Sequence, residues 1–179
     1  MLLALCDEIE AIHPEMDSPY TMRAWVYYNQ KKYEEVIQAY LHALEKTEAT
    51  QLTWKSQLWG NIGDTYQMLG KMDKTYEAYE QALKYNDKNI NVLNNYAYFL
   101  SLEERDLLKA EAMASKVIQQ QPDNPTYLDT YAWILYQEGS YMLAKFYQQK
   151  AINNMDKDAD NTTLFEHWHA ILKALGEEQ

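Results

Sequence analysis

The chain has 179 residues, and its 16 Lys and Arg against 27 Asp and Glu give a net charge of −11. This acidic balance argues against binding to nucleic acid or to an anionic membrane, because both depend on basic side chains that neutralise phosphates. No stretch reaches the roughly 18 apolar residues of a membrane span, so we expect a soluble chain without membrane insertion, and its sequence is equally compatible with a cytoplasmic or an exported location.

The first expected helix lies within residues 1–16, where Leu2, Leu5, Cys6 and Ile9 recur at helical spacing. Cys6 is the single cysteine and cannot form an internal disulfide. Its place on the apolar face predicts a small core residue.

Small residues then return at a nearly fixed interval along the chain. Ala24 and Gly63 are 39 residues apart, Gly63 and Ala97 are 34 apart, and Ala97 and Ala132 are 35 apart. A period in this range is typical of repeat proteins, in which each unit buries its apolar face against its neighbours.

Residues 56–89 contain the clearest unit. Trp59, Gly63 and Tyr66 lie at helical spacing, Gly70 ends that helix, and a second apolar pattern runs over residues 73–85. The unit is therefore predicted to be a pair of antiparallel helices joined by a tight turn.

This pattern resembles the tetratricopeptide repeat, whose marks are matched here by Trp59, Ile62, Gly63, Tyr66, Gly70, Tyr79 and Ala82. It recurs in residues 90–124, with one extra residue near Arg105, and in residues 125–158, and more loosely in residues 17–55. The resemblance, which is to bacterial multi-repeat proteins of this family, implies one all-α domain built as a right-handed superhelical solenoid. Residues 1–16 would be the second helix of a partial repeat and residues 159–179 a terminal helix, so the chain is expected to be part of a longer array.

The small residues are expected where helices approach closely, with Gly63, Ala97 and Ala132 inside pairs and Ala82 and Ala151 between pairs. A larger side chain at such a crossing overpacks the interface. Arg23 departs from the family pattern, because an aliphatic residue is usual at its position.

In an array of this family the first helix of each pair lines the concave surface. The resemblance therefore implies a set of peptide-binding residues: Trp25, Tyr28, Asn61, Asp64, Gln67, Asn94, Asn95, Tyr98, Asp129, Trp133 and Tyr136. Residues Glu166, His167 and Lys173 of the last helix extend this surface. Asparagine both donates and accepts hydrogen bonds to a peptide backbone, and rigid aromatics dominate binding hot spots.

These features predict a scaffold that binds an extended peptide segment of a partner protein. A carboxylate clamp is not expected, because its cationic positions hold Thr21, Gly60, Asn94 and Asp129, and the acidic balance favours a neutral or basic partner. Two alternatives stay open. The groove aromatics would pack on one another and bind nothing, or the chain would be a structural spacer or oligomerisation module that self-associates through apolar residues of its terminal helices, among them Leu5 and Phe165.

No catalytic, nucleotide-binding or cofactor motif is present, so we predict neither an enzyme nor a cofactor. Asp156, Asp158 and Asp160 resemble the start of a calcium loop, but Asn161 replaces its glycine and His167 stands at the twelfth position. An acidic linker without a metal is the preferred interpretation, with weak calcium or sodium binding as the alternative.

Overall fold

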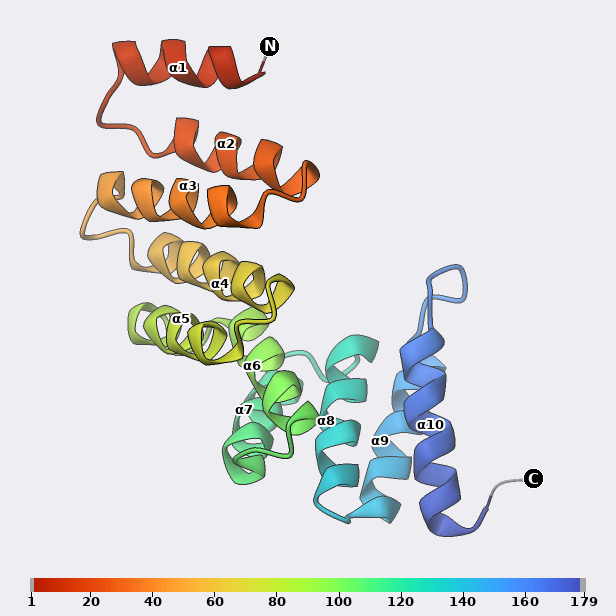
Figure 1. The fold of residues 1–179 in the computed structure, drawn as a ribbon. Coiled ribbons are helices and arrows are strands. Elements are labelled where there is room, and N and C mark those ends of the chain that lie inside the picture. The colour runs from red at the N-terminus through yellow and green to blue at the C-terminus, as the bar shows by residue number, and fades with distance from the viewer. Residues whose placement is uncertain (1, 178–179) are drawn as a thin grey trace. The chain divides into compact units, whose positions relative to one another are not determined.

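The computed structural model describes residues 2–177, which form ten α-helices and no strand (Figure 1). The all-α fold predicted from the sequence is confirmed. In chain order the helices are α1 (Leu2–Ile12), α2 (Ser18–Asn29), α3 (Tyr33–Lys46), α4 (Leu52–Met68), α5 (Met72–Tyr85), α6 (Ile90–Leu102), α7 (Leu107–Gln120), α8 (Pro125–Gln137), α9 (Tyr141–Asn154) and α10 (Thr162–Leu175).

The described residues divide into two compact units, one ending at Val92 and the other beginning at Leu93. In the first unit each helix from α1 to α5 packs on the next one in the chain (Figure 1). In the second unit α7 packs on α8, α8 on α9 and α9 on α10, and α10 also reaches α8. None of the described helices is both long and apolar enough to cross a membrane.

The turn inside each helix pair follows one hydrogen-bonding pattern. At the end of α4, the N–H of Gly70 donates to the carbonyl of Gln67, and the N–H of Lys71 donates to the carbonyl of Tyr66. This arrangement ends a helix with one residue in the left-handed region, and Gly70 has φ of 68°.

The same pattern ends α2, α6 and α8, with Lys31, Glu104 and Gly139 at the left-handed position. The connection between α6 and α7 holds one residue more than the other three, and that residue, Asp106, also has a positive φ of 46°. The extra residue predicted near Arg105 therefore lies in a turn, where it leaves both helices intact.

Gly63 lies where α4 and α5 approach most closely. A Cβ added to Gly63 would stand 2.5 Å from Cε1 of Tyr79, far inside van der Waals contact. The Tyr79 ring is fully buried, and its hydroxyl donates to Asp64 at 2.5 Å. The absence of a side chain at Gly63 is thus what admits the Tyr79 ring.

The alanines of the repeat pattern are buried as well. Ala82, Ala97, Ala132 and Ala151 have no exposed surface. Large aromatic residues fill the space around them: Tyr79, Tyr96 and Tyr131 are buried, while Trp59 and Tyr66 are partly buried and pack against Ile37, Ile62 and Ala78.

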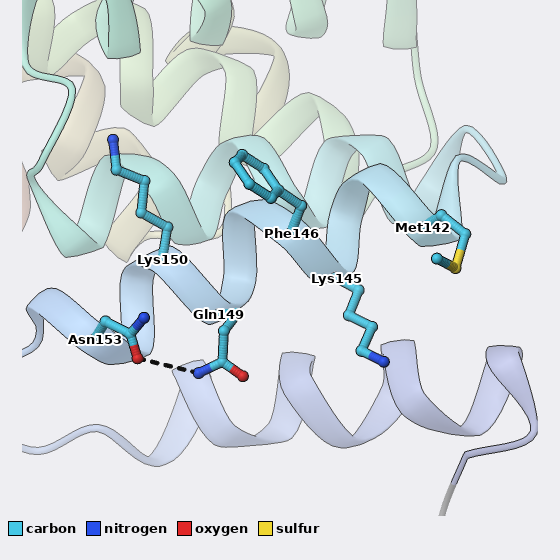
Figure 2. Close-up of a pocket in the computed structure, with 6 residues that line it drawn as sticks. All are labelled: Met142, Lys145, Phe146, Gln149, Lys150 and Asn153. Atoms are coloured by element: carbon cyan, nitrogen blue, oxygen red, sulfur yellow. Dashed lines mark hydrogen bonds between the residues drawn. The ribbon is translucent and has the colours of Figure 1, made fainter.

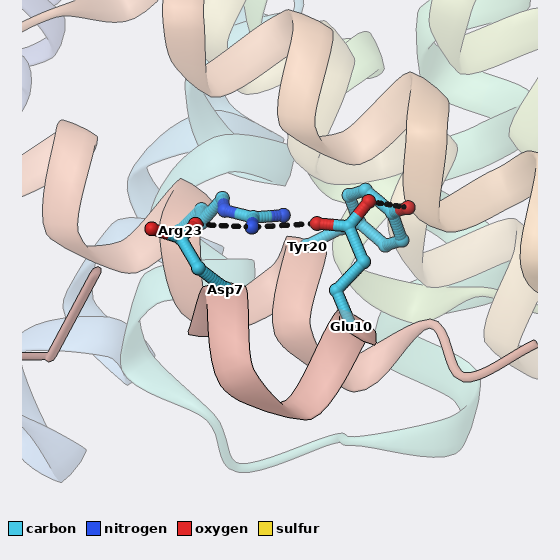
Figure 3. Close-up of polar contacts among 4 residues, drawn as sticks. All are labelled: Asp7, Glu10, Tyr20 and Arg23. Atoms are coloured by element: carbon cyan, nitrogen blue, oxygen red, sulfur yellow. Dashed lines mark hydrogen bonds and ion pairs between the residues drawn. The ribbon is translucent and has the colours of Figure 1, made fainter. Parts of the chain in front are cut away.

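A polar cluster joins α1 to α2 and accounts for Arg23 (Figure 3). Arg23 has a side chain only 15% exposed, and its Nη2 pairs with Asp7 at 2.7 Å and Glu10 at 2.6 Å. The hydroxyl of Tyr20 donates to the other Glu10 oxygen at 2.6 Å. The residue that breaks the family pattern is therefore paired across the interface, beside the fully buried Cys6 of α1.

We predict that Gly63→Ala lowers the free energy of unfolding by about 1–3 kcal/mol, the usual cost of overpacking. Thermal or urea unfolding followed by circular dichroism measures the loss. In a Tyr79→Leu background the same change should cost clearly less, because the ring that the new methyl meets is gone. An equal cost in both backgrounds would show that the contact with Tyr79 is not the cause.

We predict that docking of α1 on α2 weakens in acid. The hydrogen bond from Tyr20, and then that from Arg23, lower the pKa of Glu10. A lowered folded-state pKa stabilises the docked helix above the ordinary glutamate value of about 4.3, and that contribution disappears as pH falls through the lowered value. Hydrogen exchange of the α1 amides measures it.

The variant Glu10→Gln should lose protection of α1 at neutral pH and lose less on acidification than the wild-type chain does. Glu8→Gln is the control, since Glu8 is exposed on the same helix. If the two variants and the wild-type chain respond to acid alike, Glu10 does not control the docking.

Candidate functional site

In the second unit, α6, α8 and the segment before α10 surround a cavity of about 470 Å³. Four of the residues predicted to bind a peptide line it together: Asn94, Asn95, Tyr98 and Asp129. The other lining residues include Thr126, Thr130, Asp156, Asp160 and Asn161. Side chains 35 residues apart in the sequence therefore converge on one concave surface, which is lined mainly by asparagine, threonine and aspartate.

Asp129 connects this cavity to the interior. Its carboxylate accepts a hydrogen bond from Nε2 of Gln148 at 2.5 Å and lies 3.0 Å from Nδ1 of His167. Gln148 is fully buried in α9, and the same Nε2 donates to the carbonyl of Leu164 at 2.8 Å. Asp129 thus joins α8, α9 and α10, so it has a structural role whether or not it also contacts a ligand.

An aromatic stack runs from α8 to α10 beside the cavity. The Trp133 ring lies between Tyr136, at a centroid distance of 4.8 Å, and His167, at 4.0 Å, and both pairs are nearly parallel. Tyr98 of α6 approaches the His167 ring at 6.3 Å. Trp133 therefore packs within the unit, while Tyr98 is the aromatic residue that lines the cavity.

The cavity has a negative environment that acts on Tyr98. Burial first, and then the charges of Asp129 and Glu166, raise the pKa of the Tyr98 hydroxyl. Tyr98 therefore stays protonated at neutral pH and keeps a hydroxyl donor at the cavity wall.

The remaining predicted residues lie on α2 and α4 of the first unit. Trp25 is 62% exposed and Tyr28 is also exposed, with its ring edge-on to Tyr33. Asp64 is engaged by Tyr79, whereas Asn61 and Gln67 are half-buried. The first unit thus presents aromatic surface on α2.

The acidic segment before α10 uses its carboxylates to cap backbone groups. Asp156 accepts from the N–H of Asp158, and Asp160 accepts from the N–H and the hydroxyl of Thr162. No group of three or more His, Cys, Asp or Glu in residues 2–177 is arranged to hold a metal ion.

Sequence reasoning missed two features of this site. Gln148 was not selected, although its place four residues after Ala144 and three before Ala151 put a polar side chain on the buried face of α9. From the sequence, Asp160 was considered only as a calcium ligand. Its position at the cavity depends on the path of the segment between α9 and α10, which has no repeat pattern.

A second cavity, of about 420 Å³, lies along the outer side of α9 (Figure 2). Its lining comes from one helix, and Phe146 there is 62% exposed. Its polar groups already have partners: Gln149 donates to Asn153, Lys145 pairs with Glu177, and Lys150 pairs with Asp123. This open surface lacks convergent groups that would orient a ligand.

Apolar side chains are also exposed on the two terminal helices, as the self-association alternative requires. Leu5 on α1 and Phe165 on α10 are both exposed. Stacking through these helices stays a prediction.

Taken together, the repeated helix pairs define a helical-repeat protein. A tetratricopeptide repeat family model matches residues 18–45 and 56–89. This match supports the assignment to the tetratricopeptide repeat that the sequence pattern predicted.

Solved structures share the fold. A tetratricopeptide repeat protein from Parabacteroides merdae superposes with a TM-score of 0.74 at 19% identity, covering 89% of this chain and 60% of its own length. BtubC from P. vanneervenii gives 0.78 at 16% identity, covering 98% and 80%. YrrB, a tetratricopeptide repeat protein with an unusual peptide-binding site, gives 0.69 at 16% identity, covering 92% and 80%.

No curated protein matches the chain by sequence. The chain spans 60% of the length of the P. merdae protein. At these identities the solved structures establish the fold alone.

We predict that Asp129→Ala lowers the free energy of unfolding by about 1–3 kcal/mol, because the buried Gln148 amide loses its acceptor. Denaturant unfolding measures the change. Asp123→Ala is the matched control, since its pair with Lys150 is solvent-exposed and pairs of that kind contribute about 0–1 kcal/mol. Equal losses in the two variants would contradict a structural role for Asp129.

Proposed function

We propose that this protein is a protein-interaction scaffold that holds an extended peptide segment of a partner against the concave surface of its second unit. The observation that carries the proposal is the convergence of Asn94, Asn95, Tyr98 and Asp129 on one cavity of about 470 Å³. A fold of stacked helix pairs presents extended surfaces of this kind.

The chemistry of the lining supports a peptide over an apolar small molecule. Asn94 and Asn95 supply amide donors and acceptors that match a peptide backbone, and Tyr98 supplies a rigid ring with a hydroxyl. Most of the lining residues are asparagine, threonine and aspartate, whose polar groups can form hydrogen bonds with a peptide backbone. YrrB, which has the same fold, has a peptide-binding site.

The two units enter the proposal differently. In the second unit Trp133 is stacked between Tyr136 and His167, so both faces of its ring are already covered. In the first unit Trp25 and Tyr28 are exposed on α2. The proposal therefore assigns ligand contact in the second unit to α6 and the cavity rim.

Selection from a phage library of random dodecapeptides against the immobilised chain tests the proposal. We expect enriched peptides whose affinity, measured by fluorescence anisotropy, falls at least about tenfold on combining Asn95→Ala with Tyr98→Ala, because hot-spot aromatics contribute about 2 kcal/mol or more. Circular dichroism verifies that the variant keeps its helices.

Phe146→Ala is the matched control, since it truncates an exposed aromatic of the same unit on the outer side of α9. It should leave affinity unchanged. A selection without enrichment, or peptides that depend on Phe146 and not on Asn95 and Tyr98, would overturn the proposed groove.

A further inference from the structure

One buried polar atom at the cavity lacks a partner. Asn94 is only 6% exposed, and its Oδ1 has no hydrogen-bond donor within the described part of the chain. Its Nδ2 has a long contact of 3.5 Å with Oδ1 of Asn95. Leaving a buried acceptor unsatisfied costs free energy, about 1–3 kcal/mol for a typical group. An acceptor kept in this state at a cavity wall is one that a ligand donor would satisfy.

The charges around Asn94 are all of one sign. Asp129, Asp156 and Asp160 line the same cavity, and its lining includes neither lysine nor arginine among the described residues. Asp156 and Asp160 are on the exposed rim, while the Asp129 side chain is mostly buried. His167, which can carry a positive charge, faces the Asp129 carboxylate from α10, and Gln148 also donates to that carboxylate.

The carboxylates keep acceptor capacity beyond their present bonds. An ionised carboxylate offers about four lone-pair positions. Asp160 uses one oxygen for Thr162, and Asp156 uses one oxygen for the Asp158 N–H. A cation at the cavity would therefore find free oxygens on the rim without displacing the caps that hold the segment in place.

We propose that this cavity takes the side chain of a lysine or arginine from the bound segment, with its N–H groups donating to Asn94 Oδ1 and pairing with the carboxylates of Asp129, Asp156 and Asp160. The inference rests on the proposed function and names the residue type that the groove selects. A neutral donor would satisfy Asn94 equally well but would leave the carboxylates of Asp156 and Asp160 without a cationic partner.

The test starts from dodecapeptides selected on the wild-type chain, measured in EDTA so that no metal ion competes. We expect one position to enrich for arginine or lysine. The selected peptide is resynthesised with citrulline, which has the shape of arginine without its charge, or with acetyl-lysine for lysine. The neutral peptide should bind at least about tenfold more weakly, since hydrogen bonds to charged groups contribute about 1.5–3 kcal/mol.

Two rim variants locate the charge. Asp160→Asn should weaken the arginine peptide by about two- to fivefold, the range for an exposed ion pair, and leave the citrulline peptide unchanged. Asp158→Asn removes the same charge from the same segment, but Asp158 does not line the cavity. It should affect neither peptide.

The variant Asn94→Leu distinguishes two roles of Asn94: accepting a hydrogen bond from the ligand, or stabilising the fold. It should weaken both peptides, because citrulline also donates to Oδ1, while the thermal midpoint stays equal or rises once the unsatisfied buried group is gone. A lower midpoint with unchanged affinity would assign Asn94 to the fold and overturn this part of the inference.

The outcomes distinguish the two proposals. If arginine and citrulline peptides bind equally and both depend on Asn95 and Tyr98, the groove stands and the cationic pocket is wrong. If no selected peptide depends on Asn95 and Tyr98, the proposed function fails and the inference fails with it.

Discussion

The structure depends on close approach between helices at positions that have almost no side chain. Gly63 leaves room for a ring that a single added methyl would strike at 2.5 Å, and the buried alanines of the other pairs stand at the equivalent marks. Because the backbones come so near one another, large aromatics such as Tyr79 fill the remaining volume, and packing at that density tolerates little change.

At two helix interfaces, charged and polar side chains pair with one another where apolar packing would be usual. Arg23 occupies a position where the family usually buries an aliphatic side chain, yet it pairs with two carboxylates of α1 across the interface. In the second unit, Asp129 holds a buried glutamine and a histidine at one point between three helices. In both cases a charged residue near the interior is stabilised by partners from another helix, as burial of charge requires.

The proposed binding surface contains a buried hydrogen-bond acceptor that has no donor within the described residues. Most buried polar groups in proteins have partners, and the Oδ1 of Asn94 is an exception at a cavity bordered by three aspartates. The solved structures with this fold bear different names and assignments, so the fold by itself does not choose a ligand. We propose a basic segment as the occupant of this cavity because of the unsatisfied Asn94 acceptor and the three aspartates beside it.

The sequence by itself determined the helix pairs, the small residues at their crossings and the repeat family, because a period of about 34 residues and helical spacing are local properties of the chain. It also selected Asn94, Asn95, Tyr98 and Asp129, since the first helix of each pair repeats in register. Only the tertiary structure decided which selected residues are held by contacts within the chain. Trp133 is stacked between two rings, and Asp64 accepts a hydrogen bond from Tyr79. Asp160 lies at the cavity because a segment with no repeat pattern brings it there. Those outcomes depend on side-chain contacts between helices distant in the sequence, and a periodic pattern does not encode them.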